Sequence, residues 1–145
     1  MFKHILIPTD GSELATQAVD KGIALAAGTG AAVTVMIVTE PFRILSTDSM
    51  QVESTRASYD ADATAHADRI LQAARTKAEA AGVSVRTHHK WHDSPYEAII
   101  DTALAEGCDL IAMASHGRRG MAAVVMGSQA TKILTHSKIP VLVYR

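Results

Sequence analysis

The feature that most constrains this chain is a set of five short apolar segments, separated by stretches whose apolar residues have helical spacing. Each segment is rich in Ile, Val and Leu and is bounded by Gly, Pro, Asp or Ser, which is typical of β-strands. At least three are continuous apolar runs, as expected for a parallel sheet covered by helices on both faces. We expect strands at residues 4–10, 32–40, 82–90, 108–116 and 139–145.

The stretches between these strands predict helices, because their apolar residues recur three or four positions apart. Gly28 and Gly82 suit the positions that follow the first two helices. Ser94, Pro95 and Glu97 have the spacing of a capping box, with Ser94 as N-cap. The expected helices cover residues 12–28, 57–81, 94–107 and about 128–135.

Residues 41–56 fit neither pattern, so we expect an irregular segment there. It could serve as a lid over a bound ligand or as a partner-binding loop, or it could be disordered.

Strands that alternate with helices predict right-handed crossovers and a doubly wound α/β fold. We expect a five-stranded parallel sheet of the Rossmann-like or flavodoxin-like kind. The 145 residues, 48% of them hydrophobic, suffice for one domain, which we expect to span residues 1–145. Such sheets bind ligands beyond the carboxyl ends of their strands, at a topological switch point. The loops after the first, second and fourth strands are therefore the candidate site.

Composition narrows the classes of partner. A formal net charge of −1 leaves no overall basic field for nucleic acid or an anionic membrane surface. No apolar run approaches the roughly 20 residues of a membrane span. The single cysteine, Cys108, cannot form an internal disulfide, and Met1 leads straight into a strand without a signal peptide. We expect a cytoplasmic protein that binds neither nucleic acid nor membrane.

The stretch SHGRRGMAAVVMGS, at residues 115–128, is long for a strand-to-helix connection. Its glycines permit backbone turns that other residues resist, and its last residue stands where a helix begins. Backbone N–H groups freed in this way at a helix N-terminus bind phosphate without net basic charge, and arginines add charge-assisted contacts. The alternative is a flexible connection with solvated arginines. The residues concerned are Gly117, Arg118, Arg119, Gly120, Gly127 and Ser128.

The established phosphate motifs do not match this chain. There is no GxxxxGK[ST], since Gly127 and Ser128 are followed by Gln129 and not by a lysine. The GTG at residues 28–30 follows a helix and precedes a strand, which is the wrong order for a dinucleotide fingerprint. These observations argue against a P-loop kinase or ATPase.

Four segments resemble the universal stress protein family: KHILIPTDGSELA, IAMASHGRRG, GSQATKIL and KIPVLVYR. The resemblance spans essentially the whole chain. In the nucleotide-binding branch of that family, the loop after the fourth strand reads Gly, two residues, Gly, nine residues, Gly, then Ser or Thr. Gly117, Gly127 and Ser128 match this pattern, whereas Ala114 occupies the first glycine position.

The resemblance implies that this loop wraps the ribose and phosphates of ATP or a related adenine nucleotide. It places Gly117, Gly127 and Ser128 near the phosphates and residues 113–115 nearer the ribose and adenine. Ala114 would lower affinity if the backbone there needs a positive φ or if the ribose approaches closely. The full set assigned to the nucleotide is Pro8, Thr9, Asp10, Val38, Met113, Ala114, Ser115, His116, Gly117, Arg118, Gly120, Gly127, Ser128 and Gln129.

Three groups of polar residues have more than one interpretation. Asp10 could cap the first helix or help hold Mg²⁺ on the phosphates, and Ser12 suits the N-cap. His116 could act as an acid or base, or only shape the loop. His88, His89 and His92 lie close together and suggest a metal, but strand alternation sends His88 and His89 to opposite faces. Apart from Asp93, no cysteine or carboxylate is spaced to complete a tetrahedral site, so we do not expect zinc.

The last strand is apolar and could be an exposed edge. Ile139, Val141 and Val143 would share one of its faces. By resemblance, two copies pair residues 139–144 to form a homodimer. The alternative is an edge covered by the chain's own helices.

The favoured function is a stress-response module that acts as a sensor or signalling dimer, because nucleotide occupancy would bias its loops between two states. A slow ATP hydrolase is the second candidate, although the sequence offers no water-activating base with a cation and phosphate clamp. The third is a stress-linked interaction domain that binds no nucleotide. We assign no catalytic residue and expect at most weak ATPase activity.

Overall fold

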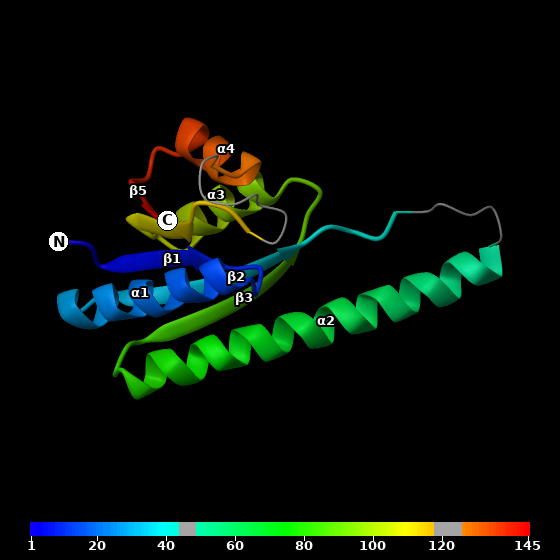
Figure 1. Cartoon of the computed structure of the whole chain (residues 1–145), viewed down its shortest axis with the longest axis horizontal. Helices are drawn as coiled ribbons and strands as arrows, with labels where there is room; N and C mark the ends of the chain where they lie inside the picture. Colours follow the sequence, from blue (N-terminus) through cyan, green and yellow to red (C-terminus); the bar gives the residue numbers. More distant parts are fainter. Residues whose placement is uncertain (44–48, 118–125) are drawn as a thin grey trace.

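The computed structural model describes residues 1–43, 49–117 and 126–145, in which strands alternate with helices (Figure 1). The strands are β1 (His4–Pro8), β2 (Ala32–Thr39), β3 (Val85–Trp91), β4 (Leu110–Ala114) and β5 (Val141–Tyr144). The helices are α1 (Glu13–Thr29), α2 (Ser49–Ala80), α3 (Pro95–Ala105) and α4 (Ser128–His136). This is the element order that the sequence predicts.

The strands form one parallel sheet with the order β3-β2-β1-β4-β5, which is the order of the first five strands of a Rossmann fold. Strand β1 pairs on one side with β2 and on the other with β4, so that Ile5 lies opposite both Val33 and Leu110. The switch point therefore lies between the carboxyl ends of β1 and β4. The predicted doubly wound parallel sheet is confirmed.

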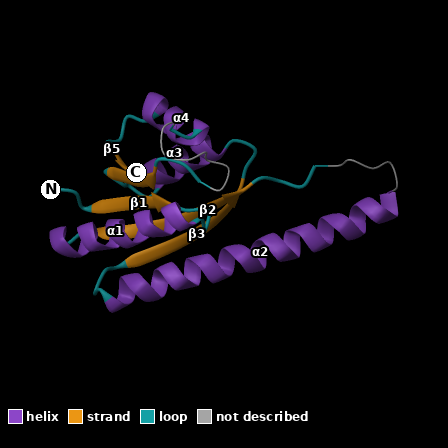
Figure 2. Ribbon diagram, viewed as in Figure 1, coloured by secondary structure: helices purple, strands orange, loops and turns teal. Residues whose placement is uncertain are grey.

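Helices cover both faces of the sheet, with α1 and α2 on one face and α3 and α4 on the other (Figure 2). Alternate residues of a central strand enter the two resulting cores. In β1, Ile5 and Ile7 enter the core under α1 and α2, and Leu6 enters the core under α3 and α4. All three side chains are fully buried. This two-sided burial explains why the strands read as continuous apolar runs.

Helix α2 begins at Ser49 and not at residue 57, so the expected irregular segment is wrong from Ser49 onward. The later turns pack on the sheet through Ala67, Leu71 and Ala74. The earlier turns extend past the edge of the sheet (Figure 1). The sequence of those turns carries no apolar stripe, which is why periodicity does not reveal them. Residues 44–48 lie outside the described residues.

No helix in the described part of the chain, including the 32-residue α2, is long and apolar enough to cross a membrane.

Two predicted helix ends differ in detail. The left-handed residue after α1 is Gly30, with φ of 73°, and not Gly28, because α1 runs to Thr29. Ser94 is the N-cap of α3, as predicted, but its side chain makes no capping hydrogen bond. Its backbone N–H instead donates to His92 Nδ1 at 2.8 Å. The predicted N-cap position is therefore confirmed, but the side-chain hydrogen bond expected of a capping box is absent among the described residues.

The carboxylate of Asp109 ties β1 to β4 at the amino end of the sheet. It accepts the backbone N–H of Lys3 at 2.9 Å and that of His4 at 3.0 Å, while the Asp109 N–H donates to the His4 carbonyl at 2.9 Å. Burial by itself raises the pKa of Asp109, but hydrogen bonds from the His4 and Lys3 backbone outweigh burial and bring the pKa below its ordinary value. The ionised carboxylate therefore stabilises the β1–β4 pair.

We predict that Asp109→Ala lowers the free energy of unfolding at pH 7 by about 1–3 kcal/mol, because two backbone N–H groups lose a charged acceptor. Since the folded pKa is depressed, this contribution is present above the unfolded-state pKa of about 3.9 and is lost as the pH falls through the folded value. Urea unfolding at pH 7 and at about pH 3 measures both effects, and the gap between wild type and variant should shrink at the lower pH.

The matched control is Asp93→Ala, because Asp93 only pairs with Arg43 across 3.7 Å on the exposed surface. It should change stability by less than about 0.5 kcal/mol. Equal costs for the two variants at pH 7 would contradict the role given to Asp109.

Candidate functional site

Two short backbone segments meet at the switch point. Residues 9–11 follow β1 and residues 115–117 follow β4, and the chain leaves these neighbouring strands toward opposite faces of the sheet. We call these two segments, together with Gly127, the switch-point site. In a doubly wound sheet this is the position at which ligands bind.

The segment after β1 is held by its own polar groups. The N–H of Thr9 donates to the Met36 carbonyl at 2.9 Å, which ties the segment to β2. Asp10 Oδ1 accepts the N–H of Ser12 at 2.9 Å, and Ser12 caps α1 by accepting the Ala15 N–H at 3.3 Å. Gly11 has a φ of +79°, in the region that favours glycine. The turn therefore holds the Asp10 carboxylate in place at the start of α1.

The segment after β4 centres on Ser115, which is 6% exposed. Its N–H donates to the Tyr144 carbonyl at 2.8 Å, and its own carbonyl accepts the N–H of Gly127 at 2.8 Å. Its hydroxyl lies 3.2 Å from His116 Nδ1. The hydrogen bond between Ser115 and Gly127 joins the two ends of the connection from β4 to α4, so α4 begins directly at the switch-point site.

Two glycines of the predicted pattern lie where a side chain does not fit. A Cβ on Gly117 would overlap the Oδ2 atom of Asp10, so the two segments touch at this point. A Cβ on Gly127 would lie 3.2 Å from His116 Cα and 3.3 Å from the Ser115 carbonyl oxygen, which is tighter than ordinary packing. A side chain at Gly117 would have to displace the Asp10 carboxylate, and one at Gly127 would have to push the Ser115 and His116 backbone by a few tenths of an ångström.

The N-terminus of α4 differs from that of α1. Gly127 is its N-cap and supplies no capping side chain, and the first turn contains no acidic residue. The N–H groups of Ser128, Gln129 and Ala130 find no acceptor among the described residues. Unpartnered N–H groups at the positive end of a helix favour an anion.

Other predicted residues have clear structural positions. Gln129 Oε1 accepts the N–H of Tyr96 at 3.0 Å, so this side chain links α4 to α3. The Met113 side chain is buried in the core, and Val38 is partly buried against the same cluster. Pro8 is the last residue of β1. Arg118 and Gly120 lie outside the described residues.

Ala114 is the last residue of β4 and pairs with Tyr144 in the parallel ladder. Its backbone is therefore extended, so position 114 does not need a positive φ. A need for positive φ therefore cannot be the reason why Ala114 would lower the affinity for a nucleotide. The other reason, a close approach of the ribose, still applies.

The histidines of β3 lie apart, as alternation predicts. His88 Nε2 lies 3.0 Å from Glu106 Oε1, whereas His89 Nε2 lies 2.7 Å from Thr39 Oγ1. No group of three or more His, Cys, Asp or Glu residues placed to hold a metal occurs in the described part of the chain.

Cys108 lies before β4, far along the strand from the switch-point site. Burial first, and the nearby Glu106 carboxylate next, raise the pKa of its thiol to about 11. The thiol is therefore protonated near neutral pH and is a poor nucleophile.

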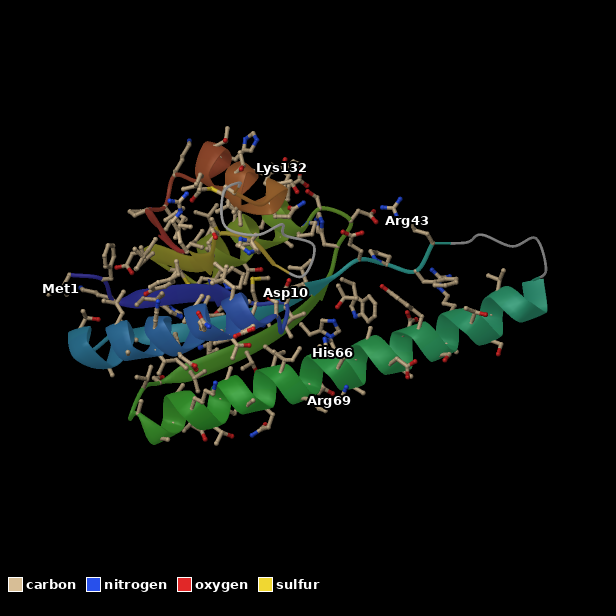
Figure 3. The ribbon with its side chains drawn as sticks, viewed as in Figure 1. Met1, Asp10, Arg43, His66, Arg69 and Lys132 are labelled. Carbon is tan, nitrogen blue, oxygen red and sulfur yellow. The ribbon has the colours of Figure 1, made fainter. Side chains whose placement is uncertain are left out.

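Sequence reasoning missed the residues of α2 that lie behind the first segment. A Cβ on Gly11 would overlap Ile70 Cδ1 and would lie 3.8 Å from His66 Nε2. Figure 3 shows His66 between α2 and the turn that carries Asp10. His66 and Ile70 share a helix face at a spacing of four residues, and only that spacing could have revealed them.

Comparison with known proteins identifies relatives along the whole chain. A model described as the universal stress protein family matches residues 1–145. The universal stress protein from the QAH/OAS sulfhydrylase 3′ region of Thermus aquaticus is 30% identical and is matched over 100% of both chains. The solved structure of the hypothetical protein MJ0577, from which a biochemical function was assigned, has a TM-score of 0.82 at 28% identity, over 99% of this chain and 95% of that one.

A universal stress protein solved in complex with cAMP has a TM-score of 0.71 at 22% identity, over 99% of this chain and 97% of its own. At this identity the likeness shows a shared fold.

We predict that Gly117→Ala lowers the free energy of unfolding by about 1–3 kcal/mol, because the added methyl group displaces the Asp10 carboxylate. In an Asp10→Ala background, where the obstructing oxygen is gone, the same change should cost less than about 0.5 kcal/mol. Urea unfolding of the wild type, Gly117→Ala, Asp10→Ala and the double variant measures both costs. Equal costs in both backgrounds would show that the two segments do not touch. Gly28→Ala is the control, since nothing lies within 4 Å of a Cβ there.

Proposed function

The chain belongs to the universal stress protein family, and we propose that it binds an adenine nucleotide, ATP first, at the switch-point site. The observation that carries this proposal is the uncapped N-terminus of α4, which begins at Gly127 beside Ser115. Its N–H groups suit phosphate oxygens. A relative of the same fold was solved with cAMP, so this fold accommodates an adenine nucleotide in at least that protein.

The backbone of the site suits the phosphates of such a ligand. Gly117 and Gly127 leave backbone exposed where a Cβ would intrude, which is the form of a phosphate cradle. We assign Gly117, Gly127 and Ser128 to the phosphates. The family resemblance adds Arg118 and Gly120, which lie outside the described residues. The ribose and base would lie toward Pro8, Thr9, Val38 and the backbone of residues 113–115.

Asp10 is the residue that would hold Mg²⁺ on the phosphates. Its carboxylate already accepts the Ser12 N–H through Oδ1 and lies against Gly117 through Oδ2. It would therefore supply one oxygen ligand, and phosphates and water would supply the others. Ser12, and not Asp10, is the N-cap of α1, so the Asp10 carboxylate supports the turn before the helix and is not needed as its cap.

Sensing fits this site better than hydrolysis. Asp10 and His116 are the titratable residues of the described segments 9–11 and 115–117. Asp10 is engaged with the start of α1, and His116 with the Ser115 hydroxyl. Efficient phosphoryl transfer needs a positioned base together with a cation and a phosphate clamp. We infer that occupancy, not turnover, changes the surface presented to partners, and that the module acts in a stress response.

We also propose that two copies pair through β5. This strand is hydrogen-bonded to β4 on one side of the described sheet and is its last strand. Ile139, Val141 and Val143 pack partly buried against the core under α3 and α4, so they share one face as predicted. Leu142 on the other face is 37% exposed. An apolar edge strand of this kind is a template for pairing with a second copy.

Calorimetric titration with ATP, with and without Mg²⁺ and with GTP for comparison, tests the nucleotide proposal. Saturable binding that prefers adenine is expected for the wild type, and product formation in the same samples should be slow or absent. Gly127→Val should weaken ATP binding at least about tenfold, because its side chain forces Ser115 and His116 from the α4 N-terminus.

Gly28→Val is the matched glycine variant and should bind like the wild type, since Gly28 has open space around it. Ala114→Gly should bind as well as or more tightly than the wild type if the ribose approaches closely. Wild-type protein that binds no adenine nucleotide at millimolar concentration would overturn the proposal in favour of an interaction domain without nucleotide.

Sedimentation equilibrium tests the dimer. Leu142→Lys should raise the dimer dissociation constant at least about tenfold, because pairing would bury two lysines at the new strand contact. Leu104→Lys introduces the same charge at a position 60% exposed on α3 and should leave association unchanged. A monomeric wild type, or equal effects of the two variants, would rule out pairing through β5.

A further inference from the structure

A groove of about 210 Å³ separates α1 from α2 behind the turn of residues 9–11. Thr9 and Gly11 close its end near the switch-point site. From there it runs between the two helices, which lie side by side on one face of the sheet (Figure 1). Nothing in the proposed nucleotide site accounts for this space.

The middle of the groove is apolar. Val19 of α1 faces Ile70, Ala73 and Ala74 of α2 across it. Packed helices normally fill such a space with interlocking side chains. Here the alanines of α2 are too short to fill it. The apolar walls suit an apolar body.

The two ends of the groove differ in charge. At the far end, Lys77 Nζ lies 2.7 Å from Asp20 Oδ1, so its charge is compensated. At the end near the turn, Arg69 has no ion-pair or hydrogen-bond partner among the residues that the structure describes. The described residues that line the groove include no acidic side chain. Arg69 is exposed, so its charge lies at the rim of the groove, where solvent or a bound anion reaches it.

A second observation concerns His66, which lies beside this end of the groove and is not one of its lining residues. His66 Nε2 is buried and has no hydrogen-bond partner in the described part of the chain. It lies one helical turn from Ile70 and 3.8 Å from the Cβ position of Gly11 (Figure 3). A buried polar atom without a partner is costly, so its presence calls for a ligand or a water there.

We propose that this groove binds a small monocarboxylic acid with an aromatic or branched aliphatic body. The carboxylate lies beside Arg69, and the body lies against Val19, Ile70 and Ala74. A cavity of about 150 Å³ holds benzene, so the larger groove accommodates a ring that carries a carboxylate. The occupant touches Thr9 and Gly11, which belong to the turn that forms half of the switch-point site. The proposal does not depend on nucleotide binding.

Benzoate is the probe, and benzyl alcohol is the same ring without the charge. Titration of the ¹⁵N-labelled full chain should give saturable amide shifts at Thr9, Gly11, Val19 and Ala74 with benzoate. The affinity for benzyl alcohol should be at least about fivefold lower, because it makes no charge-assisted contact. Equal affinities for the two probes, or benzoate shifts confined to other parts of the chain, would overturn the proposal.

Two pairs of variants test the assignment within the groove. Arg69→Gln should weaken benzoate at least about fivefold, whereas Arg56→Gln, the same change elsewhere on α2, should have less than about a twofold effect. Ala73→Leu should abolish binding by filling the groove, and Ala65→Leu, at another exposed alanine of α2, should not. Circular dichroism confirms that each variant is folded. Benzoate binding that survives Arg69→Gln or Ala73→Leu unchanged would show that the acid binds elsewhere.

Discussion

The pairing of β1 with β4 is the constraint on which the rest of this structure depends. It places two strands that are distant in sequence side by side, and the chain leaves them toward opposite faces of the sheet. The carboxylate of Asp109 holds the amino ends of this pair together, while the segments beyond its carboxyl ends are left to form a site. In this sheet, hydrogen bonds stabilise the strand pair at its amino ends, and the backbone that can bind a ligand lies at its carboxyl ends.

At the carboxyl ends of these strands, two glycines lie in close contact with neighbouring groups. Gly117 lies against the Asp10 carboxylate, and Gly127 lies against Ser115 and His116. These contacts bring the start of α4 to the end of β4, so its N–H groups are presented at the switch point without a capping side chain. The glycines serve to let segments approach, because neither Gly117 nor Gly127 has a positive φ. This reason is steric and differs from the turn-forming role that a glycine pattern first suggests.

The turn after β1 has two sides. One side meets Gly117, and the other meets Ile70 and His66 of α2. The groove between α1 and α2 ends on the same turn, at Thr9 and Gly11. A ligand on either side would contact the same few backbone atoms. Any effect of one ligand on the affinity for the other would be reciprocal, since coupling between two binding sites is a single free energy.

The element order, the parallel sheet and the family could be predicted from the sequence, because burial on both faces leaves continuous apolar runs and the glycine pattern marks the family. The sequence also located the switch-point segments, since these always follow strands. It did not reveal the first turns of α2, which carry no apolar stripe, or His66 behind the turn, which no local pattern distinguishes. Three features became visible only in the fold: Gly117 touches Asp10, the Ala114 backbone is extended, and a groove separates α1 from α2. Each of these depends on distances between segments far apart in the chain, and spacing along a sequence carries no such distance.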